Sequence, residues 1–222
     1  MAKSTLAFKP PRQRRSHESL ERILDAAESL IRERGFDNMT IAEVVQRSGS
    51  SVGSIYARFS NKVGLLEAVQ VRYHARVQNG IFSAFSGDHP RNESLMEAVG
   101  RIVDVLVHHV LSDPELFRAF VVQAVFHTGV RTRGERANAE RREKVAEILL
   151  SHRDEIRHPD PDLAARWLYS FLMAELRERV TYGERAELAG GFADEAYVTE
   201  LTRTATCYLI SDLAPVADAL LE

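Results

Sequence analysis

The residues of this chain best suited to bind another molecule lie in the segment Thr40–Lys62. A helix enters the major groove of DNA only if the side chains on its groove face are short, or are long and able to hydrogen-bond to base edges. Gly53, Ser54 and Ala57 would permit close approach, and Arg58 is the one long donor among them. This combination predicts a helix that reads duplex DNA.

Other side chains of the same segment could hold the DNA backbone. Hydroxyl and ammonium groups donate hydrogen bonds to phosphate oxygens, which fix the register of a protein on the duplex without reading its sequence. The expected phosphate ligands are Thr40, Ser51, Ser54, Tyr56 and Lys62. Any pair of short helices in an all-helical protein could show a similar pattern, so a purely structural hairpin is the alternative.

The elements that must position these side chains have the local signals of a helix-turn-helix. Thr40-Ile41-Ala42-Glu43 is a capping box, in which the hydroxyl and the carboxylate satisfy backbone amides at the start of a helix. The segment Ser48–Ser51 interrupts that helix, and Ser50 or Ser51 can cap a second short helix with Val52, Ile55 and Phe59 directed inward. Before the capping box, Gly35 is expected to end a first amphipathic helix in a left-handed cap.

The rest of the chain also has helical periodicity, and no segment alternates like a strand. We therefore predict an all-α protein of about nine helices, with regular structure beginning at Ser16 or His17. Connectors are expected at 80–90, with a turn at Gly87–Pro90, at 129–134 and at 183–191. The remaining helices are expected near 62–78, 95–110, 114–127, 135–158, 161–182 and 194–211.

Charge is distributed unevenly along the 222 residues. The net charge is −3, but residues 1–62 carry +4 and the remainder −7. A basic N-terminal part followed by an acidic remainder indicates that only the N-terminal part binds a polyanion. Residues 1–15 are read as a flexible basic arm, which either lies in a minor groove or along phosphates, or is a solvated tail.

Composition excludes several other classes of protein. No apolar run approaches the roughly 20 residues that cross a bilayer, and the first residues lack a secretory signal pattern. The single cysteine, Cys207, rules out an internal disulfide and a multi-cysteine metal site. We expect a cytoplasmic protein without cofactor, metal or membrane association.

The segment Gly49–Lys62 resembles the recognition-helix motif of the TetR family of bacterial transcriptional regulators. The preceding Ile23–Ala27, Gly35-Phe36 and Thr40–Glu43 are similar to the lead-in of that family, so the resemblance covers about Ser16–Val69. It implies that residues 51–59 form the recognition helix and that Thr40, Tyr56 and Lys62 bind phosphates. It also implies base-edge contact from among Val52, Gly53, Ser54, Ala57 and Arg58.

The resemblance implies an organisation for the whole chain. It divides into an arm (1–15), a helix-turn-helix DNA-binding domain (16–62) and a helical domain (63–222) that binds a small-molecule effector and dimerises through the last two helices. A twofold homodimer also suits a palindromic duplex operator, because two recognition helices must reach grooves about 34 Å apart. The expected function is a transcriptional regulator, namely a repressor that an effector releases from DNA.

Polar groups among aromatic side chains are the candidates for the effector pocket. For each of them an ordinary structural role is the alternative, and the effector itself is not identified by the sequence. The expected pocket residues are His108, Phe117, Phe120, Gln123, Phe126, His127, Trp167, Phe171 and Glu175.

Two other function classes fit the sequence less well. An enzyme could use His108, His109, His127 and Asp104, but adjacent histidines on a helix point about 100° apart and chelate one ion poorly. The chain also lacks the common metalloprotease, hydrolase and phosphate-loop motifs, so no catalytic residue is expected. A DNA-binding protein gated by a protein partner rather than by an effector is the other alternative.

Overall fold

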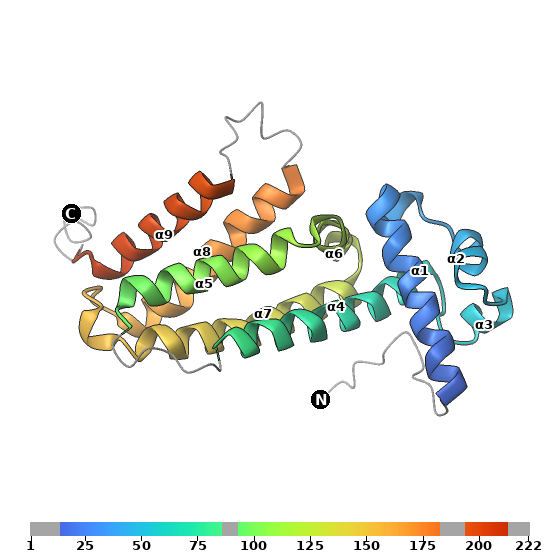
Figure 1. Cartoon of the computed structure of the whole chain (residues 1–222), viewed down its shortest axis with the longest axis horizontal. Helices are drawn as coiled ribbons and strands as arrows, with labels where there is room; N and C mark the ends of the chain where they lie inside the picture. The colour runs from blue at the N-terminus through green and yellow to red at the C-terminus, as the bar shows by residue number, and fades with distance from the viewer. Residues whose placement is uncertain (1–13, 86–92, 183–193, 213–222) are drawn as a thin grey trace. The chain divides into compact units, whose positions relative to one another are not determined.

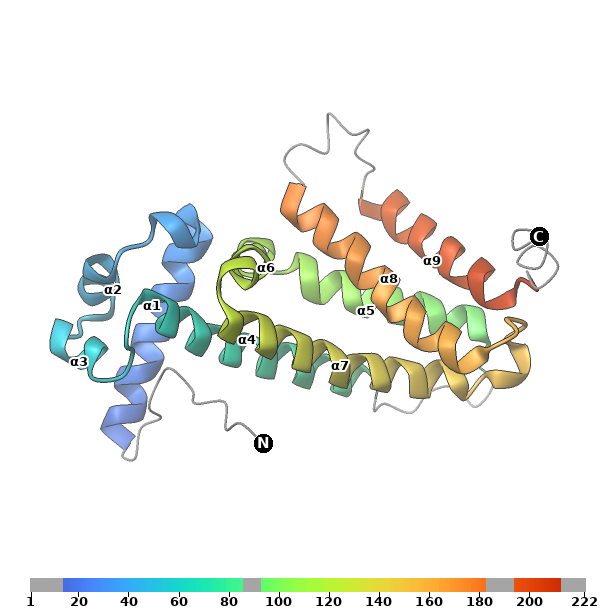
Figure 2. The same ribbon diagram turned by 180° about the vertical axis from the view of Figure 1, so that it is seen from behind.

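The computed structural model describes residues 14–85, 93–182 and 194–212. In these ranges the chain forms nine α-helices and one short 3₁₀-helix and contains no strand, which confirms the all-α prediction (Figures 1 and 2). The predicted turn at Gly87–Pro90, most of the basic arm and the loop 183–191 lie outside these ranges. The α-helices are α1 (Arg14–Asn38), α2 (Ile41–Ser48), α3 (Val52–Tyr56), α4 (Lys62–Phe85), α5 (Leu95–Leu111), α6 (Pro114–Phe126), α7 (Thr128–Leu150), α8 (Pro161–Tyr182) and α9 (Asp194–Ile210).

The helices group into two compact units. The first unit contains the described residues up to Val77 together with Asp113–Glu135, and the second contains Gln78–Ser112 together with the described residues from Arg136 onward. Helices α4 and α7 therefore contribute to both units. The boundaries predicted from sequence at residues 15 and 62 remain predictions.

In the first unit, α1 packs against α2 and α6. Its buried stripe includes Ile23, Ala27 and Leu30, as the apolar periodicity predicts. Gly35 interrupts the helix with φ 79° and ψ 162°, so the positive φ expected there is present, although ψ is extended rather than left-handed helical. One helical turn continues beyond it to Asn38.

A group of charged side chains also joins the helices of the first unit. The buried Glu28 carboxylate of α1 accepts hydrogen bonds from Arg32 at 2.6 Å and from Arg72 of α4 at 2.9 Å. Asp113, just before α6, accepts from Arg32 at 2.7 Å. Arg76 lies 3.5 Å from Glu28 and 3.6 Å from Asp113. We call Glu28, Arg32, Arg72, Arg76 and Asp113 the ionic cluster.

In the second unit, α5 packs against α8 and α9 (Figure 1). Ser94 and Glu97 form a capping box at the start of α5, which the sequence analysis did not identify. The starts of α6 at Pro114 and of α8 at Pro161 confirm the prediction, because proline lacks the amide that would be unsatisfied there.

The structure corrects the expected lengths of two helices. The recognition helix is shorter than residues 51–59, because it ends at Tyr56 and Ala57 caps it. Helix α4 continues to Phe85 instead of ending near residue 78, since Ile81 and Phe85 are buried and extend its apolar face. The expected connector at 80–90 is therefore wrong over its first six residues.

The predicted break at 129–134 is also wrong. Helix α7 begins at Thr128 and passes through Gly129 and Gly134. A glycine inside a helix costs about 1 kcal/mol relative to alanine, and tertiary packing can offset this cost. A Cβ at Gly129 would overlap a carboxylate oxygen of Glu67, and Gln70 donates to the Val130 carbonyl at 3.0 Å. The first turn of α7 thus uses glycine to approach α4 closely.

Candidate nucleic-acid interface

The helix-turn-helix is built from local caps. The Thr40 hydroxyl accepts a hydrogen bond from the Glu43 amide, and the Glu43 carboxylate accepts from the Thr40 amide, as predicted. The Thr40 hydroxyl, the largest contribution, lowers the pKa of Glu43, which keeps the cap ionised. Gly49 ends α2 in the left-handed region at φ 61°, and the Ser51 side chain caps α3 by accepting from the Ser54 amide at 3.1 Å. These capping residues lie close together in the sequence, so their spacing determines that α3 follows the turn directly.

Helix α3 divides into an inward and an outward face. Ile55 is 1% exposed and Phe59, just beyond the helix, is fully buried, so two of the three positions predicted to face inward are confirmed. The prediction that Val52 faces inward is wrong, since this first residue of α3 is exposed. Val52 and Tyr56 are 53% and 54% exposed, and Gly53 and Ala57 are exposed as well. The expected base-contacting residues thus lie on one accessible surface, except Ser54 and Arg58, which are half-buried. We call Val52, Gly53, Tyr56 and Ala57 the recognition face.

Gly53 has no structural requirement that the described residues reveal. A Cβ built at Gly53 meets no atom of these residues within 4 Å, and its φ is not positive. Gly49, in contrast, has a positive φ that disfavours other residues. The missing side chain at Gly53 therefore favours close approach of another molecule to α3.

The guanidinium of Arg58 points into the protein. It donates to the Ser54 hydroxyl at 2.8 Å and carbonyl at 3.0 Å, and to the Ser16 hydroxyl of α1 at 2.9 Å and carbonyl at 3.3 Å. Arg58 is the long donor that the sequence predicts for base edges, but its partner Ser16 lies 42 residues away, and no local pattern indicates this contact. Its contact with DNA remains a prediction.

The expected phosphate ligands differ in how accessible their polar groups are. Lys62 is half-buried, with its ammonium 3.0 Å from the Asp37 carbonyl and over the Phe36 ring, and burial lowers its pKa. The Thr40 hydroxyl donates to Glu43 at 2.8 Å. The Tyr56 side chain is exposed and makes no hydrogen bond to the described residues, so its hydroxyl is the most accessible of the group.

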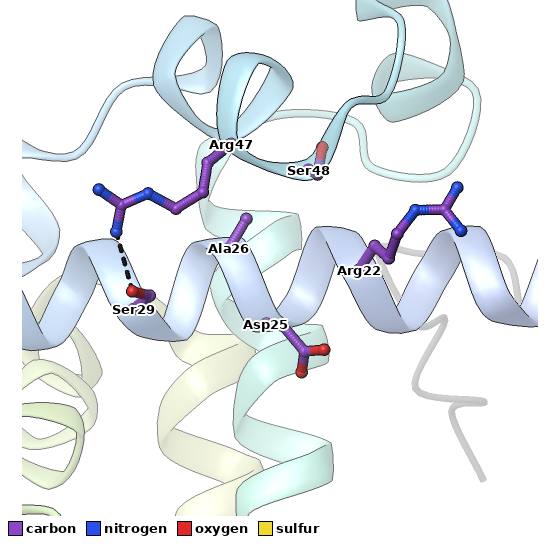
Figure 3. A pocket seen from close by; sticks show the side chains of 6 residues that line it. All are labelled: Arg22, Asp25, Ala26, Ser29, Arg47 and Ser48. Atoms are coloured by element: carbon purple, nitrogen blue, oxygen red, sulfur yellow. Dashed lines mark hydrogen bonds between the residues drawn. The ribbon is translucent and has the colours of Figure 1, made fainter.

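An open pocket of about 420 Å³ lies beside the turn, between α1 and α2 (Figure 3). Arg47 of α2 lines it and donates to Ser29 at 2.8 Å, while also pairing with Glu33. Arg22 is exposed at the opposite side. The pocket thus has basic groups near the DNA-binding segment, which the sequence analysis did not identify. Its lining residues are Arg22, Asp25, Ala26, Ser29, Arg47 and Ser48.

The predicted effector residues are divided between the units. Phe117, Phe120, Gln123, Phe126 and His127 belong to the first unit, and His108, Trp167, Phe171 and Glu175 to the second. In the first unit, Phe120 is buried against Tyr73, with ring centres 5.2 Å apart, and Gln123 is buried and donates to Asp37 at 3.0 Å. In the second, Trp167 stacks on Phe171 with ring centres 5.5 Å apart.

Three of the predicted effector residues are exposed to solvent. Phe126 is 72% exposed, Trp167 is 47% exposed and His108 is exposed. Phe126 is the last residue of α6, and His108 lies on the face of α5 opposite the buried Leu106 and Val110, so neither packs into the core. Phe117, His127, Phe171 and Glu175 are half-buried.

Buried polar side chains elsewhere in the bundle were missed. Gln70 on α4 is 2% exposed, and Arg141 on α7 and Tyr169 on α8 are 5% and 2% exposed. The Tyr169 hydroxyl donates to Asn138 at 3.3 Å. Gln70 could have been found from sequence, because it falls within the apolar stripe of Leu66, Val69 and Tyr73.

Within the described ranges, no group of three or more histidine, cysteine or acidic side chains could hold a metal ion. None of the helices in those ranges is long and apolar enough to cross a membrane.

Comparison with known proteins agrees with this geometry. Residues 23–69 match the family model of bacterial regulatory proteins of the tetR family, and residues 94–209 match the tetracyclin repressor-like C-terminal domain. The HTH-type transcriptional repressor BdcR of Escherichia coli is 32% identical over 79 residues, which is 36% of this chain and 40% of that protein. The uncharacterized HTH-type transcriptional regulator YvdT of Bacillus subtilis is 26% identical over 102 residues, 46% of this chain and 48% of that protein. The matched segments thus span less than half the length of these two curated relatives.

Solved structures show the same fold. A TetR transcriptional regulator from Rhodococcus sp. RHA1 aligns with 92% of this chain and 100% of its own at a TM-score of 0.54 and 22% identity. GusR of Salmonella enterica aligns with 88% of this chain and 97% of its own at a TM-score of 0.63 and 19% identity. With one family model on the helix-turn-helix and a second on more than half of the chain, the protein belongs to the TetR family of helix-turn-helix transcriptional regulators.

Proposed function

We propose that this regulator is a repressor, which acts in the cytoplasm by binding an inverted-repeat operator as a homodimer. The observation that carries the DNA-binding part is the recognition face, where exposed residues surround a glycine that the fold does not require. A major groove about 12 Å wide accepts such a helix most closely where side chains are missing. The relatives BdcR and ComR of Escherichia coli, each described as an HTH-type transcriptional repressor, support the direction of regulation.

Selection of bound duplexes from a random pool tests this proposal. We expect an inverted repeat whose half-site centres are about 34 Å apart, or a multiple of that distance, with affinity that falls as salt concentration rises. A pool without enrichment, or enrichment of a single asymmetric site, would contradict the proposed operator. Repression itself is tested by a reporter gene placed behind the selected sequence.

We expect the substitution Gly53→Ala to separate stability from function. Without a steric conflict, alanine should raise the free energy of unfolding by about 0.4–1 kcal/mol, because it restricts the unfolded chain. The added methyl group should nevertheless weaken operator binding, because it holds α3 away from the base edges. Urea unfolding and a fluorescence-anisotropy titration with the selected operator measure the two effects.

Gly49→Ala is the matched control for this substitution. Its φ of 61° is unfavourable for alanine, so here the same chemical change should lower the free energy of unfolding. Unchanged operator affinity in Gly53→Ala would remove Gly53 from the interface.

The proposed dimer surface lies on α8 and α9. Leu163 and Trp167 of α8 and Ile210 of α9 are 56%, 47% and 43% exposed. Trp167 also contacts Tyr208 of α9, with ring centres 4.7 Å apart, so the exposed apolar groups continue from one helix to the other. Exposed large apolar side chains on neighbouring helices are typical of an interface between subunits.

We expect Trp167→Glu to convert the homodimer into a monomer, because a charge buried at the interface centre is strongly unfavourable. Light scattering coupled to size-exclusion chromatography measures the mass directly. Met96→Glu is the control, since Met96 is 61% exposed on α5 and is not one of the residues of the proposed surface. A monomeric wild type, or a dimeric Trp167→Glu variant, would place the interface elsewhere.

We further propose that a small-molecule effector releases the repressor from DNA. The effector would bind among the half-buried and buried side chains Phe117, Phe120 and Gln123 and shift α4, which continues from the first unit into the second. An effector changes this equilibrium only through its different affinities for the two states.

A ligand screen by thermal shift tests effector control. A compound present at 100 times its Kd should add about 2.7 kcal/mol to the free energy of unfolding. Such a compound should also release the operator. Stabilisation without release would contradict effector control and favour gating by a protein partner.

A further inference from the structure

The outward side chains of α3 offer almost no hydrogen-bonding groups for base edges. Val52 is an exposed β-branched residue at the first helical position, Gly53 follows it, and Ala57 caps the helix end. The Tyr56 hydroxyl is the polar group of the recognition face, at the tip of a side chain suited to reach the backbone phosphates. What remains opposite the bases is aliphatic.

The polar side chains next to this face are engaged within the chain. The Ser54 hydroxyl accepts from Arg58 at 2.8 Å, and the Ser51 hydroxyl accepts from the Ser54 amide at 3.1 Å. The two terminal nitrogens of Arg58 are divided between Ser54 of α3 and Ser16 of α1. The guanidinium thus joins the recognition helix to the first turn of α1.

The major groove contains one apolar group that can distinguish base pairs. The 5-methyl group of thymine projects into the groove, whereas the other edges present hydrogen-bond donors and acceptors. Contact between this thymine methyl group and a valine methyl group is favourable, because both apolar surfaces are removed from water. An adjacent glycine lets the helix come near enough for this contact.

We propose that α3 reads its operator through thymine methyl groups, which Val52 and Ala57 contact, while Arg58 positions the helix and does not read a base. This inference rests on the proposed DNA-binding function and adds the chemistry of the half-site. Each half-site contains thymines at the positions that face Val52 and Ala57, and affinity for the half-site depends on their 5-methyl groups.

Replacement of thymine by deoxyuridine in the selected operator tests the methyl contacts. Deoxyuridine keeps the hydrogen-bonding groups and lacks only the methyl group. At a contacted thymine, replacement in both half-sites should weaken binding about fifteenfold, or about fourfold for each methyl group. Thymines that flank the repeat serve as the control and should show no change.

The variant Val52→Ala connects the effect to a residue. In this variant the deoxyuridine penalty at one thymine position should fall toward onefold, whereas the penalty at other thymines should remain. If no thymine in the half-site shows a penalty in the wild type, the inference is wrong.

The positioning role of Arg58 is tested by Arg58→Lys together with Ser16→Ala. Lysine keeps the charge but lacks the planar fork that bonds Ser54 and Ser16 simultaneously. Both variants should lower the melting temperature and weaken binding evenly across a set of related operators. An arginine that reads guanine bonds to N7 and O6, so replacing guanine with 7-deazaguanine would then weaken binding to the wild type but not to Arg58→Ala, which has no donor.

The outcomes distinguish this inference from the proposed function. A selected inverted repeat with a guanine at which 7-deazaguanine acts through Arg58 overturns the inference and leaves the function intact. If no duplex is enriched from the random pool, both the inference and the proposed function are wrong. A deoxyuridine penalty that disappears at one thymine position in Val52→Ala, with even losses of affinity in Arg58→Lys and Ser16→Ala, supports the inference.

Discussion

Replacement of Phe59 by alanine is expected to lower the free energy of unfolding by about 3–5 kcal/mol, the usual range for a buried aromatic residue. Phe59 is fully buried and follows α3 directly, next to the buried Ile55. Without the ring, α3 loses the packing that holds its recognition face outward. Operator binding should therefore be lost at temperatures at which the wild type binds, and urea unfolding with an anisotropy titration measures both effects.

Val52→Ala is the control for this prediction. Val52 is 53% exposed, so its truncation should change the free energy of unfolding by less than about 0.5 kcal/mol. Phe59→Leu should give an intermediate loss, because leucine fills part of the cavity. A Phe59→Ala variant with wild-type stability would show that the segment is held in place by other contacts.

Replacement of Glu28 by glutamine should lower the free energy of unfolding by about 3 kcal/mol, at the lower end of the range for a broken buried ion pair. Glu28 is 3% exposed, and its carboxylate is bonded by Arg32 and Arg72 with Arg76 nearby. The neutral amide leaves these arginines with less compensating charge. The loss stays at the lower end because Arg32 keeps its bond to Asp113 and is partly exposed.

Asp25→Asn is the matched control for this substitution. Asp25 also bonds Arg72, at 2.7 Å, but its side chain is 70% exposed. Exposed pairs contribute about 0–1 kcal/mol, so this variant should remain close to the wild type. Equal losses for the two variants would show that burial does not determine the contribution of the ionic cluster.

The loss in Glu28→Gln should also depend on pH. Burial raises the pKa of Glu28, but the hydrogen bonds and charges of Arg72, Arg32 and Arg76 together hold it below the ordinary value of 4.5. A carboxylate whose pKa is lowered by folding stabilises the folded state above its unfolded pKa, and this contribution is lost as pH falls through the folded pKa. The difference in free energy of unfolding between the wild type and Glu28→Gln should therefore be constant above pH 4.5 and become smaller below it.

The features that the sequence predicted correctly have short-range causes. The Thr40–Glu43 capping box and the proline starts of α6 and α8 depend on residues within one turn, so spacing alone identifies them. The burial of Ile55 and Phe59 follows from the same local periodicity.

The features that it missed have long-range causes. Gly129 lies in α7 at a point where Glu67 of α4 leaves no room for a side chain, and Arg58 turns inward because Ser16 of α1 accepts its hydrogen bonds. The ionic cluster likewise depends on Asp113, which lies 81 residues from Arg32. Periodicity does not reveal such partners, because they lie far away in the sequence.

The first unit is assembled from two separate stretches of the polypeptide, because residues 113–135 return to it after α5. A fragment that stops at Val77 would take Asp113 away from Arg32 and Gln123 away from Asp37. The first unit, which contains the helix-turn-helix, therefore cannot be transferred as one continuous segment. A chimera that transfers the first unit to another sensor needs three crossovers, one in α4, one before α6 and one in α7, to keep these polar partners together.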